Sequence, residues 1–276
     1  MRIGVVGTPD LSKFKSVAND VLKALDGQES VLEEETAAAL GREGVPLSGM
    51  DEVDVVISIG GDGTVLRTVK STEKPILGIN AGAMGFLTEV NPDGIEDAIG
   101  RLLEGDYTID ERTKLRTVMD GQRLQDAMNE AVIHTAQIAK MRHFSVSIDG
   151  QPATDLRADG VIVATPTGST CYAMSVGSSI VDPRVEALVI APIAPFRLAA
   201  RPFVVPATSE IDITIAEPME CTMVIDGQEV LEMTGSERLE FSASEKKGRF
   251  ISLEDDFYRD LQEKLIAFTP QAVHRH

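Results

Sequence analysis

The pattern of hydrophobic residues changes once along the chain, close to Tyr107, and this change limits the possible folds more than any other feature. Before it, short apolar runs alternate with helical stripes. A strand is expected at Arg2–Gly7, and the apolar residues from Leu11 to Leu25 then recur at three- and four-residue spacing. Strands that alternate with helices are typical of parallel crossovers, so we expect residues 1–106 to form a doubly wound α/β domain. The other elements expected in this domain are strands at Val53–Ile59 and Lys74–Ile79, a helix that begins at Val65–Val69, and a helix from Pro92 to Glu104.

Beyond this point the chain consists of short β-rich segments separated by turn signals. An Asp–Gly dipeptide between alternating strands is a strong hairpin signal, and it follows three of the segments: Asp120–Gly121, Asp149–Gly150 and Asp226–Gly227. We therefore expect residues 107–249 to form an all-β, sandwich-like domain. The last part, residues 250–276, is expected to return to the first domain with a helix from Asp255 to Ile266.

The composition excludes several classes of protein. The 23 glycines and 13 prolines are an ordinary share of 276 residues, which argues against collagen-like and disordered chains. A membrane span needs about 18 apolar residues, and the longest candidate, Val185–Phe196, is interrupted by Glu186, Pro192 and Pro195. The N-terminus has no basic and apolar regions of a signal peptide. We expect a cytoplasmic protein that does not span a membrane.

The charge balance is strongly acidic. Lys and Arg number 26 against 44 Asp and Glu, which gives a formal net charge of −18. Nucleic-acid binding needs a basic surface, so this balance argues against it. Two interpretations remain: an ordinary acidic cytosolic protein, or a protein of a high-salt cytoplasm, where repulsion between carboxylates is screened. The two cysteines, Cys171 and Cys221, form neither a disulfide framework nor a zinc site.

A glycine-rich segment, Gly60-Gly-Asp-Gly-Thr64, lies where an expected strand meets the next helix. In open α/β sheets, ligands bind at the carboxyl ends of strands, and glycines let backbone N–H groups approach a phosphate. A carboxylate repels phosphate, so Asp62 needs a reason: it either deprotonates a hydroxyl or recruits Mg²⁺. The alternative is a tight turn in which Asp62 caps the helix. No lysine follows, so the segment is not a P-loop motif.

The segment Gly60–Thr64 resembles the signature shared by NAD kinases, diacylglycerol-type lipid kinases and phosphofructokinases. Lipid kinases usually continue with Asn-Glu, whereas this chain continues with Val65-Leu-Arg67, as NAD kinases commonly do. Further segments match the NAD kinase family in order along nearly the whole chain: Gly78–Leu87, Asn129–Glu130, Asp159–Tyr172, Asp226–Gln228 and Phe257–Tyr258. The chain therefore resembles the NAD kinase family, and its acidity is compatible with an archaeal halophile.

NAD kinases transfer the terminal phosphoryl group of ATP, or in some members of polyphosphate, to the 2′-hydroxyl of the adenosine ribose of NAD. The resemblance implies that Asp62 is the base that removes the hydroxyl proton. It also implies NAD and ATP as substrates, Mg²⁺ or another divalent cation as cofactor, and a homodimer or homotetramer. It gives no metal ligands. Phosphate binding is implied for Gly60, Gly61, Gly63, Thr64 and Asn80.

The resemblance also implies a set of NAD-binding residues. Asn129 and Glu130 suit a purine and a ribose, because an amide both donates and accepts and a carboxylate accepts from hydroxyls. Their alternative is an Asn–Glu turn at the start of a strand. The segment Thr167–Ser175 offers hydroxyls and an aromatic ring to a nucleotide, and its alternative is a loop that caps the next helix. The full set is Asp62, Gly63, Arg67, Asn129, Glu130, Lys140, Arg157, Asp159, Thr167, Thr170, Cys171, Tyr172, Ala173, Met174, Ser175 and Gln228.

Some alternatives stay open. Lys140 and Arg157 are equally compatible with solvated surface cations, whereas Arg67, one helical turn past the glycine loop, is the better candidate for a phosphate. A lipid kinase shares only the glycine–aspartate loop. A non-catalytic sensor of NAD or NADP gains nothing from a carboxylate that faces phosphate. Phe196 lies where many relatives have a histidine, and Cys171 where alanine is usual, so the preference between NAD and NADH stays open.

Overall fold

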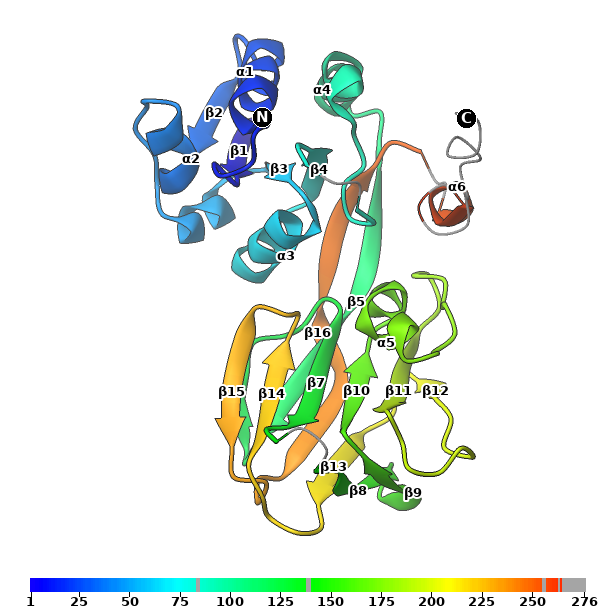
Figure 1. Cartoon of the computed structure of the whole chain (residues 1–276). Helices are drawn as coiled ribbons and strands as arrows, with labels where there is room; N and C mark the ends of the chain where they lie inside the picture. The colour runs from blue at the N-terminus through cyan, green and yellow to red at the C-terminus, as the bar shows by residue number, and fades with distance from the viewer. Residues whose placement is uncertain (83–84, 138–139, 255–256, 263, 265–276) are drawn as a thin grey trace, which may run out of the picture. The chain divides into compact units, whose positions relative to one another are not determined.

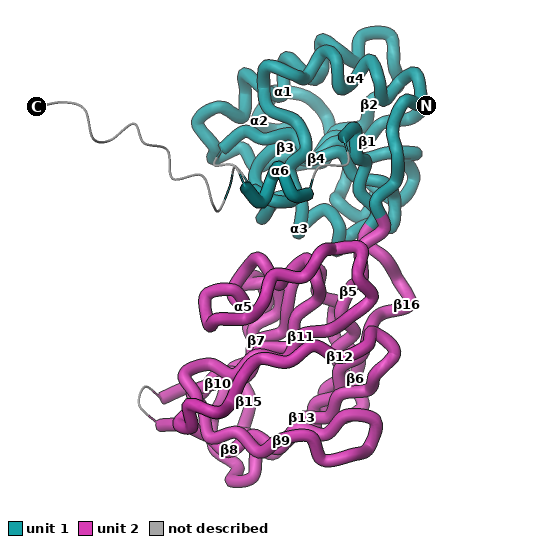
Figure 2. Tube along the Cα trace, turned by 90° about the vertical axis from the view of Figure 1, so that its right-hand side faces the viewer, with its two compact units in different colours: residues 1–110, 249–276 teal, residues 111–248 magenta. Residues whose placement is uncertain are grey.

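The computed structural model describes residues 1–82, 85–137, 140–254, 257–262 and 264. The chain divides into two compact units, which are coloured separately in Figure 2. Unit 1 consists of Met1–Asp110 and Arg249–His276, and unit 2 of Glu111–Gly248. Two long strands, β5 (Thr108–Met119) and β16 (Leu239–Ser252), include the points where the chain leaves unit 1 and re-enters it.

Unit 1 is built on parallel strands that are covered by helices. Its strands follow the order β2 (Glu29–Leu32), β1 (Arg2–Gly7), β3 (Val55–Gly60) and β4 (Ile76–Asn80), and the end of β16 pairs in parallel with β4. The helices are α1 (Phe14–Ala24), α2 (Glu34–Ala39), α3 (Asp62–Ser71) and α4 (Ile95–Glu104), with short 3₁₀ turns η1 (Leu47–Glu52) and η2 (Pro92–Gly94). The predicted α/β domain is confirmed.

Helices cover both faces of this parallel sheet. Figure 1 shows α1 and α4 on one side of β1, β3 and β4, and α3 on the other. One core cluster joins the strands to Phe14 and Val17 of α1 and to Ile99 and Leu102 of α4. Each such side chain, removed from water, contributes about 1.5–3 kcal/mol. The apolar stripe after Leu11 is therefore the buried face of a helix, as its spacing predicts.

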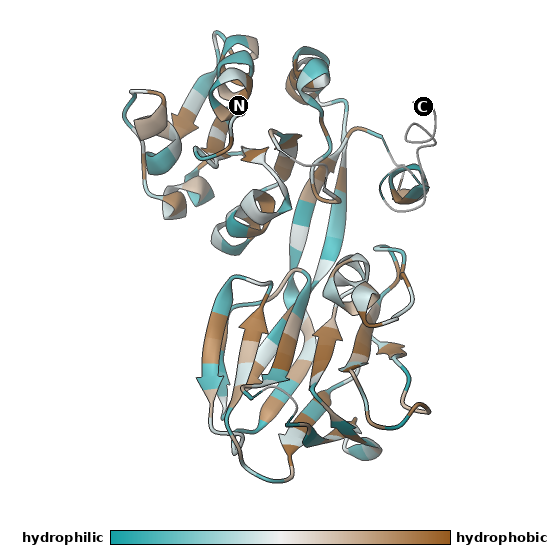
Figure 3. Cartoon of the chain, viewed as in Figure 1, coloured by the Kyte–Doolittle hydropathy of each residue, from teal (hydrophilic) through white to brown (hydrophobic). Residues whose placement is uncertain are grey.

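Unit 2 is an antiparallel sandwich of two sheets. One sheet has the order β12 (Phe203–Pro206), β11 (Ala187–Ile193), β10 (Gly160–Ala164), β7 (Glu130–Thr135), β14 (Cys221–Ile225) and β15 (Glu229–Met233). The part of the second sheet that belongs to unit 2 contains β5, β6 (Gln122–Arg123), β8 (Arg142–Ile148), β9 (Gln151–Ala158), β13 (Ile211–Ile215) and β16. A single core cluster takes residues from both sheets, among them Ile133 and Val161 from the first and Phe144 and Ile213 from the second. The predicted all-β domain is confirmed, and Figure 3 shows hydrophobic residues concentrated along its strands.

The three Asp–Gly dipeptides that were predicted as hairpin turns do form turns between neighbouring strands. They connect β5 to β6, β8 to β9 and β14 to β15. In each turn the aspartate and the glycine both have positive φ, as in Asp226 (50°) and Gly227 (65°). This conformation matches the twist of the flanking strands and is tolerated best by Asn, Asp and Gly. The hairpin predictions are therefore confirmed.

Other elements were not evident from the sequence. The strand β2 is short and largely exposed at the edge of its sheet, so it has no apolar pattern. The apolar run Val185–Phe196 contains β11, which is buried along its whole length. The described residues include no helix that is long and apolar enough to cross a membrane.

The final helix is present and lies against unit 1. The helix α6 covers Phe257–Leu261, and Nζ of Lys264 lies 5.2 Å from the centroid of the Phe86 ring. The expected helix runs from Asp255 to Ile266, and residues 255–256, 263 and 265–276 lie outside the described residues. The return of the chain to unit 1 agrees with the prediction.

Candidate active site

The glycine-rich segment lies at the carboxyl end of β3. That strand ends at Gly60, Gly61 is the N-cap of α3 with extended backbone angles, and Asp62 is the first residue of the helix. The carboxyl ends of parallel strands are where α/β proteins bind ligands. The N–H groups of a first helical turn carry partial positive charge, which favours a phosphate. The predicted strand–turn–helix arrangement is thus present.

Glycine occurs at different positions of this turn for different physical reasons. A side chain at Gly60 would overlap the hydroxyl of Thr64, so packing within the turn requires glycine there. Among the described residues, a Cβ at Gly63 would have no atom within 4 Å, and Gly63 is exposed. Glycine costs a helix about 1 kcal/mol relative to alanine, and steric crowding by the described residues does not account for a glycine at this position. A ligand that approaches the backbone would explain it.

Asp62 is held by a loop and not used as a helix cap. Its two carboxylate oxygens accept hydrogen bonds from the backbone N–H of Phe86, at 2.8 Å, and of Leu87, at 2.9 Å. A side chain at Gly85 would overlap this carboxylate, so the close approach of the loop requires glycine. The helix-cap alternative is therefore wrong, because the N-cap is Gly61 and the Asp62 side chain faces another segment.

Two predicted phosphate ligands use their side chains within the protein. Thr64 is buried, and its hydroxyl lies 2.7 Å from that of Thr8 in the loop after β1. Asn80 is also buried, and its Oδ1 accepts a hydrogen bond from the N–H of Gly82 at 2.8 Å. The Thr64 bond connects the segments that follow β1 and β3, and the Asn80 bond lies within the loop that follows β4. The two side chains stabilise the edge of the sheet on which Asp62 lies.

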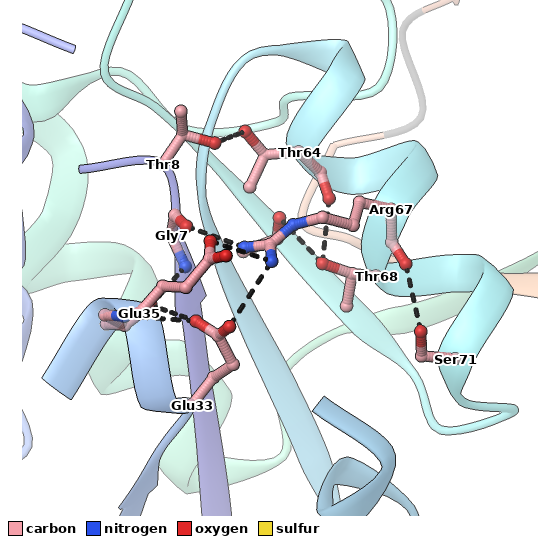
Figure 4. A network of polar contacts seen from close by, with 10 residues as sticks. Gly7, Thr8, Glu33, Glu35, Thr64, Arg67, Thr68 and Ser71 are labelled. Carbon is pink, nitrogen blue, oxygen red and sulfur yellow. Dashed lines mark hydrogen bonds and ion pairs between the residues drawn. The ribbon is translucent and has the colours of Figure 1, made fainter. Parts of the chain in front are cut away.

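Arg67 contacts several groups of unit 1. Its Nη1 donates to Oε1 of Glu33 and Oε2 of Glu35, each at 3.3 Å, and its Nη2 donates to the carbonyl oxygen of Gly7 at 2.8 Å (Figure 4). Glu33 is buried and also accepts hydrogen bonds from Thr36. The guanidinium therefore ties α3 to the ends of β1 and β2.

In unit 2, Asn129 and Glu130 lie at the start of β7, and both are buried. The carboxylate of Asp226 accepts hydrogen bonds from the N–H groups of Met128, Asn129 and Glu130 at 2.9, 2.7 and 3.2 Å. The side-chain atoms Oδ1 of Asn129 and Oε2 of Glu130 are buried and have no hydrogen-bond partner among the described residues. Buried polar atoms without partners are rare and costly, so this pair is suited to a polar ligand.

The environment of Glu130 favours its neutral form. Burial, and secondarily the negative charge of Asp226, raises the pKa of Glu130 from 4.5 to about 8. Strongly shifted carboxyl groups are concentrated at functional sites. At neutral pH the neutral carboxyl offers both an O–H donor and an acceptor.

The predicted hydroxyl-rich segment forms a 3₁₀ turn, η3 (Thr167–Thr170), and a short helix, α5 (Tyr172–Ser175). Its hydroxyls bond within the segment: Thr170 donates to the carbonyl oxygen of Thr167 at 3.1 Å, and Ser175 to that of Tyr172 at 2.8 Å. The Tyr172 side chain is exposed, Cys171 and Met174 are partly exposed, and Ala173 is fully buried in an apolar cluster. Ala173 therefore has no side-chain surface for a ligand.

This segment adjoins the Asn129–Glu130 pair. The N–H of Thr165 donates to the carbonyl oxygen of Asn129 at 2.8 Å, and the Thr165 hydroxyl donates to that of Met128 at 2.7 Å. A side chain at Gly168 would overlap the carbonyl oxygen of Asn129. Gln228, which is exposed, follows the turn that contains Asp226. The structure thus groups one part of the predicted dinucleotide-binding set around the start of β7.

Other members of the predicted set lie elsewhere in unit 2. Ala164, at one end of β10, pairs with Glu130, whereas Gly160, at the other end, pairs with His134. Asp159 precedes Gly160, so about five residues of strand, or ~17 Å, separate it from the level of Glu130. Arg157 is exposed and lies 5.1 Å from the centroid of the Phe196 ring, and Lys140 is also exposed. Within a single chain, these residues therefore do not lie next to Glu130.

Several residues of the site were not found from the sequence. Asp226 was recognised as a turn residue and as part of a segment that resembles the family, but no local signal shows that its side chain reaches residues 128–130. Gly85 and Gly168 belong to segments that the resemblance had singled out, but their close approach to Asp62 and Asn129 depends on tertiary packing. Thr165 also belongs to a matched segment, Asp159–Tyr172, and its contacts with Met128 and Asn129 likewise depend on tertiary packing.

The described residues include no group of three or more His, Cys, Asp or Glu side chains that could hold a metal ion. The carboxylates of Asp62 and Glu130 each belong to a separate unit of the chain. A protein-only metal centre is therefore not part of the described site.

A carboxylate fixed at a helix N-terminus suits proton removal beside a phosphate, and a buried polar pair suits a nucleotide. The class of protein is therefore a phosphotransferase that acts on a nucleotide. Family models agree: the N-terminal domain of ATP-NAD kinase matches residues 15–107, and its C-terminal domain matches residues 128–253. The chain belongs to the NAD kinase family.

Individual relatives support this assignment. An NAD kinase of Methanothermobacter thermautotrophicus is 42% identical over 275 residues, with 96% of each chain covered. An NAD kinase of Thermococcus kodakarensis is 43% identical and covers 94% of this chain and 96% of the relative. The crystal structure of an NAD kinase from Archaeoglobus fulgidus in complex with ATP has a TM-score of 0.79 at 30% identity, and covers 96% of this chain and 98% of that one. The crystal structure of a yeast NADH kinase complexed with NADH has a TM-score of 0.89 at 22% identity, and covers 98% of this chain and 88% of that one. At this identity, the similarity supports the fold alone.

Proposed function

We propose that this protein transfers the terminal phosphoryl group of ATP to the 2′-hydroxyl of the adenosine ribose of NAD and so produces NADP. The main support is the buried pair Asn129 and Glu130, whose oxygens Oδ1 and Oε2 lack partners among the described residues. A dinucleotide would supply those partners. Membership of the NAD kinase family, and relatives named NAD kinase along nearly the whole chain, agree with this reaction.

In this proposal Asp62 is the general base. Each of its carboxylate oxygens accepts one backbone N–H and keeps a second lone pair for a substrate hydroxyl. As the bond from the 2′-oxygen to the γ-phosphorus forms and the bond to ADP breaks, the hydroxyl proton passes to Asp62. The fixed loop at Phe86 and Leu87 holds the carboxylate in place, so no reorientation is needed during the reaction.

Positioning of the substrates is expected to lower the activation barrier more than general base catalysis does. Phosphoryl transfer passes through a loose transition state, in which the protein mainly aligns the groups and stabilises charge. Alignment lowers a barrier by about 7–11 kcal/mol, whereas a general base gives about 10²- to 10⁴-fold. The variant Asp62→Asn should therefore lose about 10²- to 10⁴-fold in kcat while it still binds NAD.

For the dinucleotide we propose Asn129, Glu130, Thr167, Thr170, Tyr172 and Gln228 as one group of contacts. Cys171, Met174 and Ser175 adjoin this group. Lys140, Arg157 and Asp159 form a second group at the opposite end of β10 and would contact a different part of a ligand. We leave out Ala173, which is buried, and Arg67, whose guanidinium contacts Glu33 and Glu35.

We also propose that Mg²⁺ enters with the phosphates of ATP. The described residues provide no metal centre of their own, and ATP is strongly anionic. A divalent cation bound with ATP would supply the missing positive charge. Full activity in excess chelator would contradict this part of the proposal.

The direct test is to incubate the purified protein with ATP, Mg²⁺ and NAD and to measure NADP. The assay is run from low salt to molar KCl because of the charge of −18. Asp62→Asn is compared with Asp120→Asn, which changes an exposed turn residue in unit 2 and should keep full activity. If the protein binds NAD but forms no NADP at any salt concentration, it is a sensor. If it phosphorylates diacylglycerol, it is a lipid kinase.

Three further expectations belong to the same proposal. Parallel assays with polyphosphate and with NADH determine the donor and the acceptor. A homodimer or homotetramer is expected, and sedimentation measures it. A cytoplasmic location is expected, and fractionation of the source cells tests it.

A further inference from the structure

The three Asp–Gly turns share a feature beyond their backbone conformation. Asp120, Asp149 and Asp226 have φ of 49°, 51° and 50°. In each turn the aspartate side chain accepts a hydrogen bond from the backbone of a distant segment. Asp120 accepts from the N–H of Arg238, and Asp149 from that of Glu210, both at 2.9 Å and both at exposed positions. In all three turns, an aspartate with positive φ thus connects two distant segments through a side-chain hydrogen bond.

Asp226 differs from the other two in its burial and its number of donors. It is 6% exposed, and its carboxylate receives three successive backbone N–H groups, from residues 128–130. Successive N–H groups that converge in this way form an anion-binding concavity. Here the anion is a side chain of the protein itself, and two of the three donors belong to Asn129 and Glu130.

The main chain of the pair is also held from the opposite side. The carbonyl oxygens of Met128 and Asn129 accept hydrogen bonds from the hydroxyl and the N–H of Thr165. The main chain is therefore fixed on both sides, while Oδ1 of Asn129 and Oε2 of Glu130 have no described partner. This division is what a preformed ligand site requires: a rigid backbone and side chains that are free to bind.

We propose that Asp226 is a positioning residue for the dinucleotide: its carboxylate fixes the main chain of residues 128–130 and so presents the Asn129 and Glu130 side chains to the ligand. This inference rests on the proposed function. Asp226 does not touch the substrate in this account, and it acts through the two residues that it holds.

The charge of Asp226 has a second consequence. After burial, it is the other cause that raises the pKa of Glu130 to about 8. The neighbouring elements β10 and η3 carry no titratable side chain, and β14 carries only Cys221, which pairs with Thr135 at the far end of β7. Glu229, at the start of β15, lies beyond β14. Removal of the Asp226 charge should therefore lower the pKa of Glu130.

The test compares Asp226→Asn with Asp149→Asn. Asparagine tolerates positive φ, so both turns are kept, and each variant loses one charge and one acceptor. For Asp226→Asn, Kd and KM for NAD should rise about 10- to 100-fold, because buried N–H groups lose a charged partner. KM for ATP should change less than about twofold. For Asp149→Asn, all three constants should stay within about twofold of the wild type.

A second readout separates positioning from a general loss of stability. The carboxyl of Glu130 is titrated by NMR in the ligand-free protein. The midpoint should be near 8 in the wild type and in Asp149→Asn, and lower in Asp226→Asn. Equal NAD affinity in the two variants, or an unchanged midpoint in Asp226→Asn, would overturn the inference.

A third measurement needs no variant and decides the case if Asp226→Asn does not fold. In ligand-free wild-type protein, the amide hydrogens of Asn129 and Glu130 should exchange slowly, because the carboxylate already holds them. Exchange at the rate of an unstructured peptide would overturn the inference. If the wild type makes no NADP, the proposed function fails. Hydrogen exchange and titration still test whether the Asp226 carboxylate holds the main chain of residues 128–130.

Discussion

The variant Gly63→Ala separates a glycine kept for packing from one kept for a ligand. Gly63 is the second residue of α3, its φ is not in the left-handed region, and an added Cβ would meet no atom of the described residues within 4 Å. Alanine restricts the unfolded chain more than glycine does, and a compatible Gly→Ala change stabilises a protein by about 0.4–1 kcal/mol. For a domain of this size that corresponds to a rise in Tm of about 1–4 °C.

The same variant should lose activity. If a phosphate of ATP lies against the backbone at Gly63, a methyl group displaces it, and a misplacement of about 1 Å costs about 10²-fold. We therefore expect kcat/KM for ATP to fall by about 10²-fold in a protein that is at least as stable as the wild type. The two assays are differential scanning calorimetry and NADP formation at varied ATP.

The chain offers a matched control. Gly100 lies inside α4, and a Cβ there would also have no atom within 4 Å. Gly100→Ala should raise Tm by a similar amount and leave kcat/KM unchanged. Full activity of Gly63→Ala would refute the argument that a ligand approaches this backbone, and a lower Tm would refute the argument that the site is open.

Three other predictions concern stability and charge. Because the pKa of Glu130 is raised from 4.5 to about 8, the stabilisation from its neutral form is fully present below pH 4.5 and is lost as the pH rises to about 8. Glu130→Gln should therefore raise the Tm of the ligand-free protein at pH 8 much more than at pH 5 and weaken NAD binding; an equal rise at both pH values would contradict the shift. Arg67→Met removes a partner of the buried Glu33 and should lower the free energy of unfolding by about 1–3 kcal/mol. KM for ATP should stay within about threefold of the wild type. A large loss of ATP affinity at unchanged stability would instead indicate that Arg67 binds a phosphate. With a net charge of −18, Tm should rise as KCl approaches 1 M, where screening acts beyond ~3 Å, and a Tm that falls would remove the interpretation of a halophilic protein.

Much of the fold could be predicted because its signals are local. The apolar stripe of α1 and the Asp–Gly turns depend on residues within one or two turns of each other, and both are found as expected. Elements without a local pattern were missed, such as the short edge strand β2, whose residues are mostly exposed.

The site was predicted less completely. The glycine-rich turn and the Asn129–Glu130 pair were recognised by resemblance, and the structure gives both a geometry that suits a ligand. The partner of Arg67 was not predictable, because Glu33 lies 34 residues away in sequence and becomes a neighbour only when β2 pairs with β1. A side chain with a charge is attracted to whichever opposite charge the packing brings close.

The sequence alone determined which residue types were available: an aspartate among glycines, an Asn–Glu pair, and turns that accept a left-handed aspartate. The tertiary structure alone decided what those groups touch. It placed the Asp62 carboxylate on the N–H groups of Phe86 and Leu87, and Asp226 on an amide 97 residues earlier. The physical reason is range: backbone preferences act between neighbours in the chain, whereas hydrogen bonds and burial depend on which distant segments pack together.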